Sequence, residues 1–286
     1  MKKQGTYHLL KKYAGDSLKW LLAAILVVLT IFPFLYIVST ALKSNTELFS
    51  SANSLFPQIP KWDNLLESWK LLDFTRCFIN SLIVSLSATF GTIAVCSMAA
   101  YAFTRFEFRV KNLLFILYLS TIMMPIVVRL IPSYILCKYL NLRDTYPGMF
   151  LPLIAWSIPL GTFLLRQFFI GIPRDLDEAA KIDGAGHFRI FLSIILPNAK
   201  SSMATLGTYV FISAWNNLIW MLLVVSKQTM WTITLGIGSI CGASVLKLPP
   251  WNLIMGVIVI GLIPVLLLYF IFQKYFIQSV TATGIK

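Results

Sequence analysis

A short polar stretch, residues 175–197, holds the side chains of this chain that are best suited to binding another molecule in water. It combines an acidic first turn, an alanine pair and two glycines, which are Asp175, Asp177, Glu178, Ala179, Ala180, Gly184 and Gly186. The spacing of Asp175 and Glu178 is that of a capping box, and acidic side chains at a helix start interact favourably with the helix dipole. The pattern predicts a helix, a glycine bend and a second short helix over roughly residues 187–195. A rigid charged element favours docking to a protein over the alternative, a passive amphipathic linker.

Four further residues with binding chemistry lie inside apolar stretches: Arg129, Trp215, Asn216 and Asn217. A charge within an apolar span normally faces a cavity or a partner, although a long side chain near the end of a span can instead reach the interface. An aromatic face beside two amides suits the recognition of a sugar. The alternative is that the asparagines hydrogen-bond a neighbouring helix. These four residues are our candidates for a substrate path.

The elements that must position these residues are membrane-spanning helices. The chain has 286 residues, of which 58% are hydrophobic and 12% are charged, whereas a soluble domain carries about a quarter charged residues. Apolar runs of about 20 residues are long enough to cross a bilayer as helices. Six such runs predict an all-α membrane protein with spans at about 20–42, 78–103, 112–137, 145–165, 201–226 and 248–273. Met123, Met124, Pro125 and Pro132 predict a kink in the third span.

The distribution of basic residues predicts the orientation of these spans. Lysines at 2, 3, 11, 12 and 19 precede or begin the first span, and positive residues favour the cytoplasmic side. The segment 1–19 and, with six spans, the tail 277–286 are therefore predicted to be cytoplasmic. The loop 166–200, which contains the polar stretch, is predicted on the same side. The formal net charge of +13 is thus explained by topology.

Composition and motifs exclude several other kinds of site. We predict no nucleic-acid partner, because no soluble domain is present to carry a basic patch. We also predict no metal site, because the four cysteines are scattered and lack the spacing of metal ligands. The chain has no glycine-rich phosphate-binding loop of the type G-x-x-x-x-G-K-[ST]. We therefore expect it to bind no nucleotide itself.

The polar stretch also resembles the signature of a known family. The order E-A-A, three residues, G, nine residues, I, one residue, L-P resembles that of the membrane permease subunits of ABC importers. The matching positions are Glu178, Ala179, Ala180, Gly184, Ile194, Leu196 and Pro197. Residues 78–82, 99–103, 182–185, 214–220 and 273–286 resemble the carbohydrate-uptake branch, and its maltose-type second permease in particular. The resemblance covers essentially the whole chain.

This resemblance implies a fold, a mechanism and a set of partners. The implied fold is that of a type I importer permease, and the implied role is half of a heterodimeric pore with a second homologous permease. Two cytoplasmic ATPase subunits, which hold ATP and Mg, would dock on the coupling loop, as we call residues 166–200. The implied contacts are Glu178, Ala179, Ala180, Asp183, Gly184, Ile194, Leu196 and Pro197. An extracytoplasmic solute-binding protein would deliver a sugar or oligosaccharide across a bacterial inner or cytoplasmic membrane.

There are three alternatives, of which the first two belong to other classes and the third keeps the ABC permease class. A secondary transporter would need carboxylates inside its spans for ion coupling, and none of the 11 acidic residues falls there. A membrane-embedded enzyme would need a histidine or carboxylate constellation, and His8 and His187 stand far apart. An ABC permease for another solute, such as glycerol phosphate, a phosphonate or an amino acid, shares the coupling signature. Only the carbohydrate-like segments argue against that third alternative.

Overall fold

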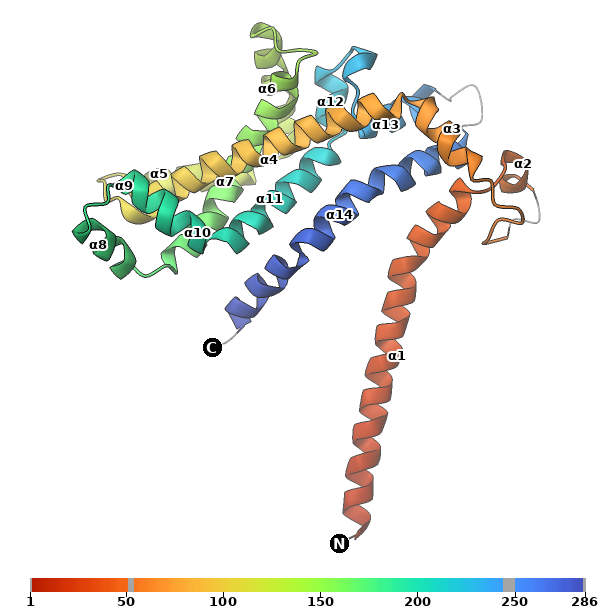
Figure 1. The fold of residues 1–286 in the computed structure, drawn as a ribbon, viewed down its shortest axis with the longest axis horizontal. Coiled ribbons are helices and arrows are strands. Elements are labelled where there is room, and N and C mark those ends of the chain that lie inside the picture. The colour runs from red at the N-terminus through yellow and green to blue at the C-terminus, as the bar shows by residue number, and fades with distance from the viewer. Residues whose placement is uncertain (1, 51–53, 244–249, 285–286) are drawn as a thin grey trace. The chain divides into compact units, whose positions relative to one another are not determined.

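The computed structural model describes residues 2–50, 54–243 and 250–284, and the side chains of 19–50, 54–242 and 250–273 (Figure 1). These residues form helices and turns, with no strand among them. The all-helical class that the sequence predicted is confirmed. Of the predicted terminal segments 1–19 and 277–286, the side chains of 1–18 and 277–286 lie outside the described ones. The first two residues of the predicted sixth span also lie outside the described residues.

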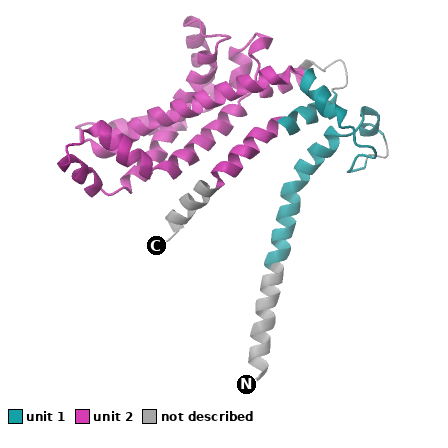
Figure 2. Cartoon of the chain, in the orientation of Figure 1, with its two compact units in different colours: residues 1–71, 247–260 teal, residues 72–246, 261–286 magenta. Residues whose placement is uncertain are grey.

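The chain divides into two compact units, and the first comprises residues 1–71 and 247–260 (Figure 2). Its helices are α1 (Lys2–Ala41), α2 (Asn45–Leu48), α3 (Asp63–Leu71) and the beginning of α14 (Trp251–Gly284). The buried Asn64 donates both amide hydrogens, to the carbonyls of Ala41 and Lys43, each at 2.8 Å. Ser68 donates to the carbonyl of Leu253 at 2.9 Å. These bonds satisfy polar groups that would be costly to bury alone.

The second unit comprises residues 72–246 and 261–286 and contains both candidate sites. Its long helices are α4 (Phe74–Arg105), α7 (Tyr146–Ile170) and α11 (Lys200–Trp215), which pack on one another. Glycines permit the close approach: a Cβ at Gly161 would come within 2.7 Å of the Cys96 sulfur, and one at Gly207 within 3.1 Å of Ile93. Small residues at such crossings are typical of helix packing in membranes.

Two predicted spans are interrupted in this unit. The predicted third span forms α5 (Lys111–Ser120), η1 (Thr121–Met123) and α6 (Ile126–Tyr139). It bends by 100° at Met124 and Pro125, so the kink predicted there is confirmed. The predicted fifth span forms α11 and α12 (Ile219–Val224), separated by residues 216–218. Asn217 accepts a hydrogen bond from the backbone N–H of Trp220 at 3.0 Å, because asparagine side chains satisfy the free N–H groups of a helix start.

The shorter helices of the unit complete the connections. They are α8 (Asp175–Ile182), α9 (His187–Ile190), the π-helix η2 (Phe191–Ile195), α10 (Leu196–Asn198), η3 (Gln228–Met230) and α13 (Ile233–Ala243). Figure 1 shows α8, α9 and α10 grouped at the end of the unit where α4 ends. The coupling loop is therefore supported by the C-terminal end of a long helix.

Four described helices are long and apolar enough to cross a membrane: Lys19–Ala41, Phe74–Arg105, Tyr146–Ile170 and Trp251–Gln273. The number rises to five if the bent pair α5–α6 forms one span. The interrupted α11 has only 16 residues and is not among them. The count of six spans and the cytoplasmic position of both termini therefore stay predictions.

Candidate functional site: the coupling loop and a polar cavity

The coupling loop has the predicted helix–bend–helix form. α8 ends at Ile182, and Gly184 adopts a left-handed conformation with φ of +78°, which favours glycine because other residues are strained there. Residues 187–198 then continue as α9, η2 and α10. The bend and the second helical stretch are thus both confirmed.

The capping box predicted at Asp175 and Glu178 is wrong. The residue at the N-cap of α8 is Arg174, and no side chain caps the helix. Glu178 stays exposed, and Asp177 is buried instead. Of these two acidic residues in the first turn, Asp177 is therefore buried and Glu178 stays at the surface. A local capping pattern does not predict this difference.

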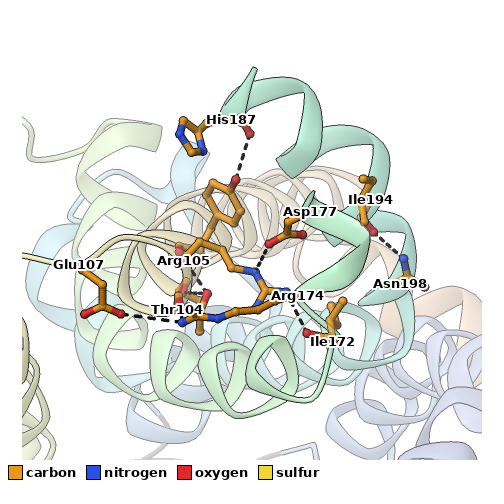
Figure 3. Close-up of polar contacts among 11 residues, drawn as sticks. Thr104, Arg105, Glu107, Ile172, Arg174, Asp177, His187, Ile194 and Asn198 are labelled. Atoms are coloured by element: carbon orange, nitrogen blue, oxygen red, sulfur yellow. Dashed lines mark hydrogen bonds and ion pairs between the residues drawn. The ribbon is translucent and has the colours of Figure 1, made fainter. Parts of the chain in front are cut away.

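Asp177 makes a buried ion pair with the last residue of α4. Its Oδ2 lies 2.6 Å from Nε of Arg105, and the two side chains are 9% and 6% exposed (Figure 3). Arg105 also donates from Nη2 to the carbonyl of Ile172 at 3.0 Å. One guanidinium thus holds both α8 and the turn that precedes it against α4.

A second arginine makes the reverse connection. Arg174 donates from Nη2 to the carbonyl of Thr104 at 3.2 Å and lies 3.8 Å from the Glu107 carboxylate. The latter pair is exposed at 61% and 74%, so its contribution to stability is small. The backbone contact, in contrast, adds a further tie between the end of α4 and the beginning of α8 (Figure 3).

Tyr101 supports the second half of the coupling loop. Its hydroxyl donates to the carbonyl of His187 at 3.2 Å, and its ring packs on Phe191 with centroids 5.2 Å apart. Phe106 lies edge-on to Tyr101 and to the His187 imidazole, at 5.7 and 4.9 Å. Ile190 is 1% exposed on the same inner side. The loop is therefore fixed on its inner side by aromatic packing as well as by charge.

The outer surface of the coupling loop combines charge with exposed apolar side chains. Glu178 and Asp183 are exposed, and Ile182 and Phe188 are 87% and 70% exposed. Large apolar groups exposed in this way indicate a contact surface. Of the other predicted contacts, Ala179, Gly184 and Pro197 are exposed, whereas Ala180, Ile194 and Leu196 are partly buried and pack on the core.

A cavity of about 310 Å³ with a mixed polar and apolar lining lies among α6, α7 and α11, and we call it the Arg129 cavity. Its polar and aromatic lining consists of Arg129, Trp156, Ser157, Tyr209, Ser213 and Asn217. Two of the four predicted substrate-path residues, Arg129 and Asn217, thus meet at one cavity. Asn216 lines a second hollow that shares Trp156, Ser213 and Asn217 with the first.

Trp215 does not line either hollow. It is 4% exposed, stacks on Phe211 with centroids 5.5 Å apart, and meets Phe78 edge-on at 6.0 Å. Its position in the core matches an ordinary packing role. Trp156, Tyr209 and Ser213 were not identified from sequence, because an aromatic or hydroxyl side chain in an apolar helix has no sequence signal that separates cavity-facing from lipid-facing positions.

A polar clasp joins the start of α7 to the end of α12. Asp144 Oδ1 accepts hydrogen bonds from the backbone N–H groups of Ser226 and Lys227 at 2.6 and 2.8 Å. Burial alone would raise the pKa of Asp144, but these hydrogen bonds and the charges of Lys227 and Arg143 hold it below its ordinary value. The clasp fixes α12, whose first turn is capped by the cavity residue Asn217.

Comparison with known sequences finds one family and many relatives. Residues 89–282 match the family described as "Binding-protein-dependent transport system inner membrane component". The sn-glycerol-3-phosphate transport system permease protein UgpE of Yersinia pestis bv. Antiqua (strain Antiqua) is 34% identical, over 88% of this chain and 91% of that protein. The diacetylchitobiose uptake system permease protein NgcG of Streptomyces coelicolor is 31% identical, over 89% and 83%. The sulfoquinovosyl glycerol transport system permease protein SmoH of Agrobacterium fabrum is also 31% identical, over 96% and 95%.

Comparison with solved structures gives the same fold. A chain of a bacterial ABC transporter involved in the import of the acidic polysaccharide alginate superposes with a TM-score of 0.75. The match covers 91% of this chain and 96% of that chain, with 21% sequence identity. A chain of the alginate transporter in complex with an alginate pentasaccharide-bound periplasmic protein superposes with a TM-score of 0.63. The fold is that of a type I ABC importer permease.

Proposed function

This chain belongs to the family of inner membrane components of binding-protein-dependent transport systems, and from that premise we propose that it forms half of the translocation pore of an ATP-driven importer. It is a multi-pass membrane protein and a transport subunit rather than an enzyme. We propose that it carries a sugar or an oligosaccharide, as the diacetylchitobiose permease relative does by name. An extracytoplasmic solute-binding protein delivers the solute, and the chain resides in the inner or cytoplasmic membrane of a bacterium.

The observation that carries this proposal is the two-sided coupling loop. Its inner side is fixed to α4 by the buried pair of Arg105 and Asp177, while Glu178 and Ile182 on its outer side remain exposed. A helix that is rigidly attached to a transmembrane helix, and that offers a free surface, can transmit the movement of a docked motor. We propose that an ATPase subunit occupies this surface, with Glu178, Asp183 and the neighbouring motif residues as contacts.

The remaining partners follow from the same proposal. A second, homologous permease subunit completes the pore, and two ATPase subunits supply the ATP and Mg that this chain has no motif to bind. The periplasmic protein in the alginate transporter structure supports the inclusion of a solute-binding protein. In this arrangement the chain contributes half of the translocation pore and the surface to which an ATPase subunit docks. The ATPases hydrolyse the ATP.

A second candidate solute is glycerol phosphate. The relatives at 34% and 35% identity are named for sn-glycerol-3-phosphate transport, and the arginine in the cavity suits an anion. Both candidates leave the importer mechanism unchanged. They differ in the charge of the solute.

The proposed function is tested by reconstituting the importer in proteoliposomes. We expect ATP hydrolysis that is stimulated by the solute-binding protein only when this chain, a second permease and the ATPase are combined. A charge-assisted hydrogen bond is worth about 1.5–3 kcal/mol, so Glu178→Lys is expected to lower coupled uptake roughly tenfold or more.

The matched control is Asp175→Lys, which makes the same charge change in the first turn of the same helix. Its effect on the helix dipole should be similar, so a smaller loss in this variant isolates the contact made by Glu178. Stimulated ATPase activity without a second permease, or equal uptake in both variants, would contradict the proposal.

A further inference from the structure

Arg129 is a partly exposed cation for which the described part of the chain supplies no anion. Its Nε is inaccessible to solvent and has no hydrogen-bond partner, and no described carboxylate forms an ion pair with it. Its recorded contact is with the ring of Trp156, whose centroid lies 5.9 Å from the guanidinium carbon. The cavity therefore presents a cation that no described carboxylate neutralises.

The position of Arg129 in α6 adds to the positive potential. It is the fourth residue of this 14-residue helix, which begins at Ile126 immediately after the 100° bend. The N-terminal end of a helix carries a partial positive charge, so a cation in the first turn is unfavourable. The charge of Arg129 and the partial positive charge of the helix N-terminus thus lie at the same wall of the cavity. No carboxylate of the described residues lines the cavity to balance them.

The rest of the lining combines apolar side chains with neutral hydrogen-bonding groups. The hydroxyls of Tyr209 and Ser213 have no hydrogen-bond partner among the described residues, and both line the Arg129 cavity. Asn217 uses its amide oxygen to cap α12, which leaves its amide nitrogen as a donor. No aspartate or glutamate of the described residues lines the cavity. Donors and hydroxyls beside one cation suit a small hydroxylated solute that carries a single negative group.

The position of the guanidinium favours a role at the cavity over one at a membrane interface. A snorkelling arginine places its charged group in water or among lipid headgroups. Here the guanidinium lies over Trp156, which lines the same cavity and packs edge-on against the fully buried Trp220 at 5.2 Å.

We infer that the Arg129 cavity binds an anionic group of the transported solute, so that this subunit selects for a phosphorylated, sulfonated or carboxylated polyol over a neutral one. The inference rests on the proposed function, because it assigns a recognition role to a cavity within the pore-forming subunit. Arg129 binds the anion, Trp156 holds the guanidinium in place, and Asn217 and the two hydroxyls contact the solute's hydroxyl groups. The cavity volume of about 310 Å³ limits the recognised portion to a single small unit.

The first measurement identifies the solute. The cognate solute-binding protein is purified from cells and denatured, and the released solute is analysed by mass spectrometry. We expect a compound with a phosphate, sulfonate or carboxylate group, and the measured mass distinguishes among these three. Release of a neutral sugar would overturn the inference while leaving the importer function intact.

The second measurement follows uptake of that identified solute, in radiolabelled form, by proteoliposomes that hold the complete importer. We expect Arg129→Gln to lower the uptake rate roughly tenfold or more, as the loss of a charge-assisted contact predicts. Arg129→Lys, which keeps the charge, should retain most of the rate.

The matched control is Arg166→Gln. Arg166 also lies over an aromatic ring, that of Phe115 at 4.3 Å, and its Nε is likewise buried without a hydrogen-bond partner, but it does not line the cavity. Equal uptake in Arg129→Gln and Arg166→Gln would overturn the inference, even if the solute is an anion. A wild-type complex with no ATPase activity dependent on the solute-binding protein would instead refute the proposed function, and the inference with it.

Discussion

The coupling loop and the Arg129 cavity each contain an arginine, and the two arginines have different surroundings. Arg105 has a carboxylate at 2.6 Å and a carbonyl at 3.0 Å. Arg129 has an aromatic ring at 5.9 Å and no ion pair with a described carboxylate. Arg105 thus serves the fold, whereas on our inference Arg129 serves a ligand. This difference predicts opposite effects on stability and on transport.

The largest expected effect on stability comes from breaking the buried pair. Asp177→Ala leaves Arg105 as an uncompensated buried charge, so we expect the free energy of unfolding to fall by about 3–5 kcal/mol. Chemical denaturation in detergent measures this change, and hydrogen exchange over residues 175–183 should show early opening of α8. Replacing both partners, as Arg105→Met with Asp177→Leu, should recover most of the stability. If the single variant is as stable as the wild type, the pair does not hold the loop.

An intermediate effect is expected at the bend of the coupling loop. A valine at position 184 must adopt the left-handed conformation that Gly184 has at φ of +78°, which costs about 1–2 kcal/mol for a residue with a Cβ. We expect Gly184→Val to displace α8 and to uncouple ATP hydrolysis from uptake, with the protein still inserted.

The control for this change is Gly186→Val. Gly186 has a φ of −73°, and a Cβ there would meet nothing within 4 Å, so the substitution should be tolerated. Parallel assays of ATP hydrolysis and uptake in both variants separate backbone strain from added bulk. Normal uptake by Gly184→Val would count heavily against the coupling role of the bend.

The smallest expected effect on stability comes from removing the other arginine. Arg129→Met eliminates a partly exposed charge whose recorded contact is a cation–π interaction, typically worth about 0.5–1 kcal/mol. We therefore expect the free energy of unfolding to change by less than about 1 kcal/mol, measured in detergent as for Asp177→Ala. A loss as large as that of Asp177→Ala would mean that Arg129 serves the fold, and the contrast between the two arginines would disappear.

Much of the coupling loop could be predicted from sequence, because its signals are local. The turn at Gly184 follows from the conformational freedom of glycine, and the two helical stretches follow from residues within a few positions of one another. The role of Asp177 could not be predicted, since its partner, Arg105, lies 72 residues earlier and only the tertiary fold brings them together. The predicted capping box failed because the residue at the N-cap is Arg174, so Asp175 already lies inside the helix.

The cavity was predicted only in part. Arg129 and Asn217 were identifiable because a charge or an amide is unusual within an apolar run. Trp156 and Tyr209 are residue types that also occur on lipid-facing helix surfaces. Whether they line the cavity depends on which face each helix turns toward it, and the sequence alone does not show this. Trp215 shows the opposite error: its neighbours are polar, yet its ring is buried against Phe211.

The π-helix at Phe191–Ile195 links the spacing of the coupling signature to the direction in which the following residues point around the helix axis. Each residue of an α-helix advances the chain by about 100° around the axis, and a π turn absorbs one extra residue without rotating the next helical turn. Nine residues separate Gly184 from Ile194, and the π turn falls at the end of that interval. Deleting a single residue such as Ser193 would either straighten the turn or rotate Leu196 away from the core. The interval therefore sets the angular position of α10, not merely its distance along the chain.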